Sequence, residues 1–302
     1  MSWQFFLLVF GPPLLGLTGA LIWWAFRLRH HLALRRGFAV AAVLGALIGV
    51  VGDLVLRVIG VPSLLPFELP AGFWEAYRDF RFLAPPLAGL LAVLVLAFPI
   101  VSRKASATAA LTPRSPVTFI QGRWLVTPGI LLAILVAIAV ACGVVSEPDE
   151  MTGRYTMWMI EIGGEFAMGT TIYGWFYSLP ALAVLLVMII VGWIDLALIS
   201  RPALNQDNGE DQQRRVVRSR NVVTAITATL FLAVSQAFGS LAGTASLRAS
   251  SGSFNSWTPI AALEPALHVT SYVAAALGVA YWVSIALTAL PSPTRTRAAA
   301  TA

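Results

Sequence analysis

The sequence predicts an all-α integral membrane protein, a bundle of about seven transmembrane helices with its N-terminus outside and its C-terminus in the cytoplasm. Three observations predict this class. Hydrophobic residues make up 58% of the 302 residues and charged residues only 11%, a balance typical of polytopic membrane proteins. Apolar runs of about 20 residues recur, which is the length that crosses a bilayer core. Basic residues are concentrated in alternate loops between these runs.

The first apolar run covers residues 5–26. No charge precedes it, and RLRHHLALRR follows it. A cleavable signal peptide carries its positive charges before the apolar stretch, so we expect an uncleaved anchor here. Gly11, Pro12 and Pro13 are expected to produce a plain bend in this helix rather than a break that lines a cavity. The other spans are expected at residues 37–60, 83–102, 125–146, 174–199, 221–247 and 267–290.

The basic residues predict the orientation of the spans. Most arginines lie in the loops after the first, third, fifth and seventh spans. Because cytoplasmic loops carry an excess of Lys and Arg, this side is predicted to be cytoplasmic. The exceptions, on or near the outer side, are Arg57, Arg78, Arg81, Arg154 and Arg248. The net charge of +6 therefore reflects membrane topology, and we expect no nucleic-acid partner.

The loops are too short to hold a second domain. Residues 1–290 are expected to form one polytopic membrane domain, and residues 291–302 a disordered cytoplasmic tail. The Arg-rich loop 201–220 has no apolar periodicity, so we expect it to be mobile and a candidate contact for a membrane or cytoplasmic protein partner. Arginine is strongly preferred over lysine, and Asn-x-Ser/Thr acceptors are lacking. Both features fit a prokaryotic cytoplasmic membrane.

The outer side carries two segments with structure of their own. Residues 71–82 place aromatic and acidic side chains on different sides of a short helix, which suits the membrane interface. Residues 154–173 contain two β-prone runs around Gly163 and Gly164, which predicts a β-hairpin; an interfacial helix is the alternative. Pairing across this turn places Met159 opposite Met168, and it places Glu161 and Glu165 on opposite faces of the hairpin.

The second and sixth spans carry the polar and small residues that matter most. Asp53 follows Gly45 and Gly49 at a spacing of four, so its carboxylate lies on a small-residue stripe expected to face another helix. Arg57 lies one further turn along and can pair with it. A structural ion pair and a substrate or proton contact are equally good interpretations. A second helix-packing seam follows three residues of the sixth span, which are Ser235, Gly239 and Gly243.

Further candidates for a polar binding site lie on the outer side. Glu264 and His268 are one turn apart at the start of the last span, and the hairpin carboxylates Glu161 and Glu165, together with Arg248, are placed near them by the topology. With Asp53 and Arg57 they make up the candidate polar binding site. The spacing matches no metal motif, so we predict no metal. No cofactor is expected, since Lys104, the only lysine, lies in a loop and not where a retinal Schiff base needs it.

These observations leave three functions open. The first is a non-catalytic transport subunit, or permease component, or an accessory subunit that works with partner chains in an unknown oligomer. The second is an outer-leaflet enzyme that acts on a lipid-linked or amphipathic substrate and uses the outer carboxylates. The third is a membrane sensor whose outer cap binds a ligand. Because no catalytic motif is present, we predict the first.

Overall fold

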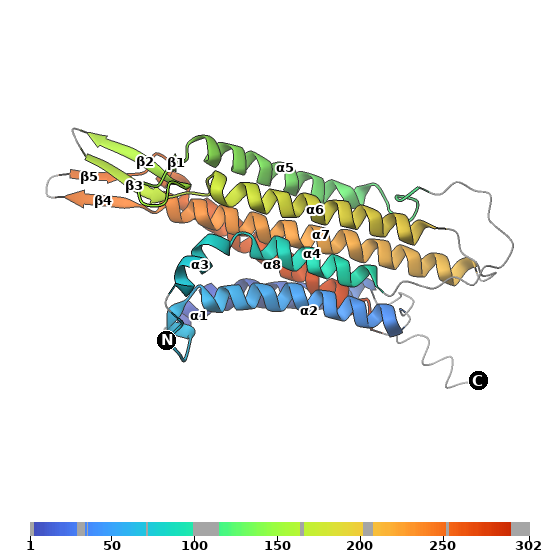
Figure 1. Ribbon diagram of the computed structural model, residues 1–302. Coiled ribbons are helices and arrows are strands. Elements are labelled where there is room, and N and C mark those ends of the chain that lie inside the picture. The colour runs from blue at the N-terminus through green and yellow to red at the C-terminus, as the bar shows by residue number, and fades with distance from the viewer. Residues whose placement is uncertain are drawn as a thin grey trace.

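The computed structural model describes residues 3–28, 34, 36–70, 72–98, 115–163, 166–201, 208–251 and 254–290. Long helices form a bundle, and short strands extend from one end of it (Figure 1). We call this end the sheet end. The helices are α1 (Trp3–Trp23), α2 (Arg36–Ile59), α3 (Phe73–Phe80), α4 (Ala84–Ala97), α5 (Arg123–Val144), α6 (Trp175–Ser200), α7 (Asn208–Ala245) and α8 (Glu264–Leu287). A π-helical turn, Trp24–Leu28, continues α1, and 3-10 turns cover Pro62–Leu64 and Ala261–Leu263.

Six of the described helices are long and apolar enough to cross a membrane. They are α1, α2, α5, α6, α7 and α8. A seventh span results if α3 and α4, which meet at a bend of 69°, are counted as one. On its own α4 has 14 residues and rises only about 21 Å, less than a bilayer core of about 30 Å. The prediction of about seven spans is therefore confirmed as six or seven candidate spans. This number and their apolar composition are typical of a multi-pass membrane protein.

The direction of the chain supports counting α4 as a pass along the bundle. The end of α2 lies at the sheet end, where the Tyr77 hydroxyl of α3 donates to the Leu56 carbonyl at 3.3 Å. The end of α5 also lies there, beside the strands (Figure 1). The chain therefore returns to the opposite end between α2 and α5, and α4 makes that passage. As a result, α1 begins at the sheet end and α8 finishes at the other end.

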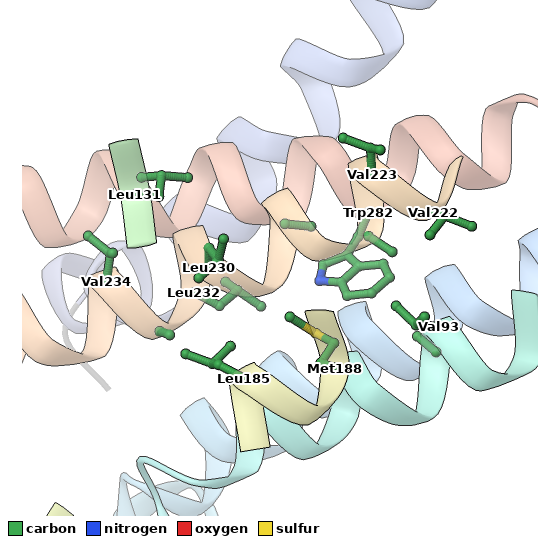
Figure 2. Close-up of a cluster of buried hydrophobic side chains, with 14 of the residues drawn as sticks. Val93, Leu131, Leu185, Met188, Val222, Val223, Leu230, Leu232, Val234 and Trp282 are labelled. Carbon is green, nitrogen blue, oxygen red and sulfur yellow. The ribbon is translucent and has the colours of Figure 1, made fainter. Parts of the chain in front are cut away.

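Helix α7 is the centre of the bundle. Two-thirds of its apolar span is buried (67%), against 22–33% for the other five spanning helices. It packs against α8, α4, α5 and α6, and its small residues Ala225, Ala228 and Ala237 are fully buried. Small side chains let helix backbones approach closely where lipid provides no hydrophobic driving force. Figure 2 shows Trp282, Met188, Leu185 and Val93 converging around α7 in the core.

The predicted packing residues lie in different surroundings. A Cβ atom at Gly45 would meet Leu96 of α4 at 3.4 Å, and one at Gly49 would overlap the Trp282 indole of α8. The Ser235 hydroxyl donates to the Ser271 carbonyl of α8 at 2.8 Å, and Gly239 faces the Ser271 side chain. The position of Gly243 is open, with no atom within 4 Å of a Cβ built there.

The hairpin at residues 154–173 is confirmed, but its predicted register is wrong. Strands β2 (Tyr155–Gly163) and β3 (Phe166–Thr171) pair antiparallel, and β1 (Glu147–Pro148) joins β2 as a third strand. Ile160, not Met159, lies opposite Met168, and the ladder is irregular between Glu161 and Gly163. One extra residue in a strand reverses the face of every side chain beyond it. This register turns Thr156, Met168 and Ile172 inward together, all of them buried.

The loop from β1 to β2 is closed by its own hydrogen bonds. The Asp149 carboxylate accepts from the amides of Met151 and Thr152 and from the Thr152 hydroxyl, at 3.0, 2.8 and 3.0 Å. These hydrogen bonds lower the pKa of Asp149 below its ordinary value. Gly153 completes the turn with φ +67°, a conformation that glycine adopts without strain.

The prediction of a mobile loop over residues 201–220 is wrong for most of its length. Helix α7 begins at Asn208 and runs for 38 residues, about 57 Å. Arginines in its first turns contact other helices of the bundle. Arg215 donates to the Ile199 carbonyl at 2.7 Å, and Arg218 lies 4.0 Å above the Phe38 ring. Arginine also favours helix, so polarity without apolar periodicity did not mean a loop. We call this end of the bundle the arginine end.

Two further features complete the fold. Strands β4 (Arg248–Ser251) and β5 (Phe254–Trp257) form a second hairpin at the sheet end, which the sequence did not predict. The short helix predicted at residues 71–82 is α3. The predicted tail, residues 291–302, lies outside the described residues.

Candidate functional site

The predicted ion pair of α2 is formed. The Arg57 Nε atom lies 2.7 Å from the Asp53 Oδ2 atom, and the two side chains are 19% and 8% exposed. One turn of helix separates the residues, so the pair closes on its own helix. Asp53 is thereby neutralised in a buried position, where an isolated carboxylate would cost several kcal/mol or more.

The other predicted site residues do not join this pair. Arg248 lies 3.6 Å from Glu264, with its own side chain 73% exposed, so this is a surface contact of about 0–1 kcal/mol. His268 is exposed on α8. Glu161 lies opposite Ala167 in the hairpin, and its side chain is not described. Glu165 lies outside the described residues. The predicted residues that can be placed are therefore spread over the sheet end instead of lining one cavity.

A second ion pair attaches the sheet to the helices. Arg154 Nη1 lies 2.6 Å from Asp79 Oδ2 of α3, and its guanidinium lies 4.6 Å above the Phe176 ring of α6. Next to it, Tyr173 is buried against Phe82, with the ring centres 4.9 Å apart. This burial raises the pKa of Tyr173. The contacts hold the three-stranded sheet over α3 and α6, so their role is structural.

A large cavity lies elsewhere, along the side of the bundle. It is a groove of about 930 Å³ lined by α1, α5, α7 and α8. Helix α1 packs on α8, and α5 packs on α7, so α7 and α8 form the floor while α1 and α5 form the two sides. The side of the groove formed by α1 has few side chains, because Gly11, Gly16 and Gly19 line it. No atom lies within 4 Å of a Cβ built at Gly11 or at Gly19.

Most of the groove is apolar. Its lining along α1 and α8 includes Leu7, Leu15, Val273 and Leu277. From Tyr272 to Ser284 the floor covers thirteen residues of α8, and the twelve steps between the first and the last rise about 18 Å. This length corresponds to a little more than half of a bilayer core of about 30 Å.

Polar groups are concentrated at the arginine end of the groove. Arg123 and Trp124 from the start of α5 and Arg220 from α7 all line it. The Arg220 guanidinium lies 5.9 Å from the centre of the Trp124 ring, and Arg123 Nε donates to Gln121 Oε1 at 2.8 Å. The groove is thus amphipathic along its length, with an apolar section toward the sheet end and a cationic section at the arginine end.

The sequence contains residues that line this groove, but their pattern predicts other roles. Arg123 and Arg220 belong to the basic loops that predict membrane topology. Gly11 and Pro12 were expected to produce a plain bend, whereas both line the groove, and α1 continues through them without a break. Which helix faces which cannot be derived from hydropathy, so the groove could not be predicted.

Comparison of the chain with protein-family models, with curated proteins and with solved structures gave no match. The fold and the groove define the class, which is a helical protein of multi-pass composition with an amphipathic groove on the side of its bundle.

Proposed function

We propose that the protein is a non-catalytic subunit of a transport system, or an accessory subunit, that holds an amphipathic molecule in the groove between α1 and α5. The observation that carries this proposal is the groove itself, with its long apolar section and its cationic end. Protein sites for small molecules are commonly concave, mostly apolar and provided with a few polar groups that fix orientation. The volume of about 930 Å³ lies at the upper end of the usual range of about 300–1,000 Å³.

The position of the groove favours a ligand that comes from the membrane. Both of its sides are spanning helices whose outer residues are apolar and exposed, among them Leu14, Ile22, Val126 and Ile130. On a membrane-spanning bundle such surfaces face lipid. A molecule with a hydrocarbon part can therefore enter sideways without leaving the bilayer.

The orientation completes the proposal. We infer from the distribution of arginines that the protein lies in a cytoplasmic membrane of a prokaryote with its sheet end outside and its arginine end in the cytoplasm. The cationic section of the groove then lies at the inner leaflet. The Arg-rich segment 201–220 remains a candidate partner contact, although part of it is occupied by contacts within the chain.

The two alternative functions receive less support. An outer-leaflet enzyme needs carboxylates that share a cavity with the substrate, and the described candidates Asp53 and Glu264 are each paired with an arginine outside the groove. A sensor would bind its ligand at the strands of the sheet end, and no described residue of these strands lines the groove.

A cavity-filling variant tests the proposal. The change Gly19→Leu places a side chain in the open groove, and leucine also suits a helix better than glycine, so we expect normal folding and loss of the ligand. Native mass spectrometry of protein extracted in mild detergent measures the bound amphipathic molecule. The matched control is Gly129→Leu, because Gly129 lies in α5, is equally open and does not line the groove.

The wild type and the control should retain a bound species of lipid size, and Gly19→Leu should lose most of it. Equal retention by both variants would contradict the groove as the binding site. A wild type that carries no bound amphiphile under any mild extraction would contradict the proposed function as a whole.

A further inference from the structure

The geometry points to the chemical class of the ligand. We propose that the groove binds an anionic lipid with a phosphate headgroup, that Arg123 and Arg220 hold the phosphate, and that the acyl chain lies along α1 and α8. This inference rests on the proposed function, because it identifies what the same groove takes. The preference for a phosphate headgroup can fail while the proposed function holds, since a groove of this shape can also bind a neutral amphiphile.

The arginine end of the groove carries two positive charges. Arg123 and Arg220 come from different helices, and both line the groove at this end. Among the described residues, neither guanidinium forms a salt bridge with a carboxylate. Arg57, Arg154 and Arg248, by contrast, each have an acidic neighbour. Two cations that line one cavity, with no carboxylate partner among the described residues, favour an anion as the ligand.

The two guanidinium groups favour phosphate as the anion. Guanidinium groups present several N–H donors in a planar fork, which matches the oxygens of phosphate, and charge-assisted hydrogen bonds of this kind are about twice as strong as neutral ones. Basic pockets between transmembrane helices on the cytoplasmic side commonly bind phosphorylated headgroups. A lipid without phosphate offers these guanidinium groups no negative charge, and their neutral contacts, Arg123 with Gln121 and Arg220 with Trp124, supply none either.

The groove matches a lipid of one leaflet in its length and in the order of its apolar and polar sections. From the level of Ser284 to the level of Tyr272 the floor rises about 18 Å, which accommodates an acyl chain of one leaflet in a bilayer core of about 30 Å. Trp23 and Trp124 line the groove, at the end where the charges lie. Tryptophan is enriched at the level of lipid headgroups. A headgroup at Arg123 and Arg220 therefore lies at the depth that a lipid of this leaflet requires.

The experiment compares lipids that differ only in the headgroup. The purified protein is equilibrated in mixed detergent micelles with phosphatidylglycerol, phosphatidylcholine or diacylglycerol of identical acyl chains, and native mass spectrometry measures the occupancy of each. A basic residue near a membrane surface contributes about 1 kcal/mol to the binding of an anionic lipid, which corresponds to about fivefold in affinity. We expect phosphatidylglycerol to bind about 25-fold more tightly than diacylglycerol, with phosphatidylcholine between them.

Variants assign this selectivity to the two arginines. We expect Arg123→Gln and Arg220→Gln each to reduce the preference for phosphatidylglycerol about fivefold, the double variant to abolish it, and Arg220→Lys to retain most of it. The control is Arg36→Gln, because Arg36 begins α2 at the same end of the bundle, is exposed and does not line the groove. Inorganic phosphate at millimolar concentration should not displace the lipid, because it lacks the chain that occupies the apolar section.

The outcomes separate the two proposals. Equal occupancy by all three lipids, together with a loss of all three in Gly19→Leu, would overturn the phosphate assignment and leave the amphiphile site intact. A selectivity that falls equally in Arg36→Gln would overturn it too, since general surface charge would then explain the effect. Displacement by inorganic phosphate would assign the cationic end to a soluble anion and contradict the lipid. Unaltered binding of phosphatidylglycerol to Gly19→Leu would contradict the groove itself.

Discussion

At the scale of single residues, the same chemistry has different consequences in different surroundings. Arg57 and Arg220 are both arginines of spanning helices. Arg57 is bonded to the Asp53 carboxylate one turn before it, which makes the pair self-sufficient. Arg220 lines a cavity beside Trp124 and has no such carboxylate among the described residues. Pairing, more than depth or charge, decides which arginine is available to a ligand.

The Asp53 and Arg57 pair should behave as a structural unit. Removal of one partner leaves a buried charge, which costs about 3–5 kcal/mol for a fully buried pair; because Arg57 is 19% exposed, we expect about 2–3 kcal/mol for Arg57→Ala. The double change Asp53→Leu with Arg57→Met removes both charges and should be close to the wild type. Thermal unfolding in detergent measures these differences.

The double-mutant cycle also separates structure from ligand binding. Neither residue lines the groove, so lipid occupancy of the double variant should be unchanged. A double variant as unstable as the sum of the single variants would show that the two charges act independently, contrary to the ion-pair interpretation.

At the scale of elements, small residues set the distances between helices. The bundle core is assembled by contacts in which one helix has no side chain and the next presents a large one, as at Gly49 of α2 and Trp282 of α8. The glycines of α1 have two different surroundings. Gly16 contacts the backbone of α8, whereas Gly11 and Gly19 face open space. Glycine therefore brings helices together in the core and leaves room in the groove.

A single methyl group distinguishes these two uses of glycine. In Gly49→Ala the new Cβ atom overlaps the Trp282 ring, so α2 or α8 has to shift, and overpacking of this kind costs about 1–3 kcal/mol. In Gly19→Ala nothing lies within 4 Å, so the change should be neutral or slightly stabilising through helix propensity. Chemical or thermal unfolding measures both, and equal effects of the two changes would contradict the packing described for α2 and α8.

At the scale of the whole molecule, the bundle has two chemically distinct ends. In the part of the chain that the structure describes, the sheet end carries five short strands and α3, while the arginine end carries the extended first turns of α7 (Figure 1). In the orientation that we propose from the positive-inside rule, the arginine end lies in the cytoplasm. The chain follows this division consistently, because α1 begins at the sheet end and α8 finishes at the arginine end.

Cysteine labelling in intact cells tests this orientation. The native Cys142 is buried, with 3% exposed, so background labelling by a membrane-impermeant maleimide should be low. A cysteine in place of Met151, whose side chain is 95% exposed at the sheet end, should react from outside. A cysteine in place of Arg201, which is exposed after α6, should react only after permeabilisation. The reverse pattern would invert the orientation.

The sequence by itself determined the class of the molecule and most of its elements. Run lengths and hydropathy located both ends of α1, α2, α5, α6 and α8 to within about three residues, since a bilayer core demands about 20 apolar residues and the chain has to supply them locally. Helix α7 is the exception, because it begins at Asn208 and its predicted span begins at residue 221. The pair Gly163–Gly164 predicted the hairpin, because the residues that form a tight turn are adjacent in the sequence. The Asp53 and Arg57 pair also followed from a spacing of one helical turn.

Only the tertiary structure decided the register of the hairpin, the helical start of α7 and the groove. The register depends on which strand face can be buried against the bundle, where Thr156, Met168 and Ile172 lie together. The first turns of α7 are held by contacts such as that of Arg218 with Phe38 of α2. The groove depends on α1 and α5 standing apart on either side of α7 and α8. Hydropathy is the same on every lipid-facing side of a helix, so it contains no information on which helices become neighbours or on where a cavity remains between them.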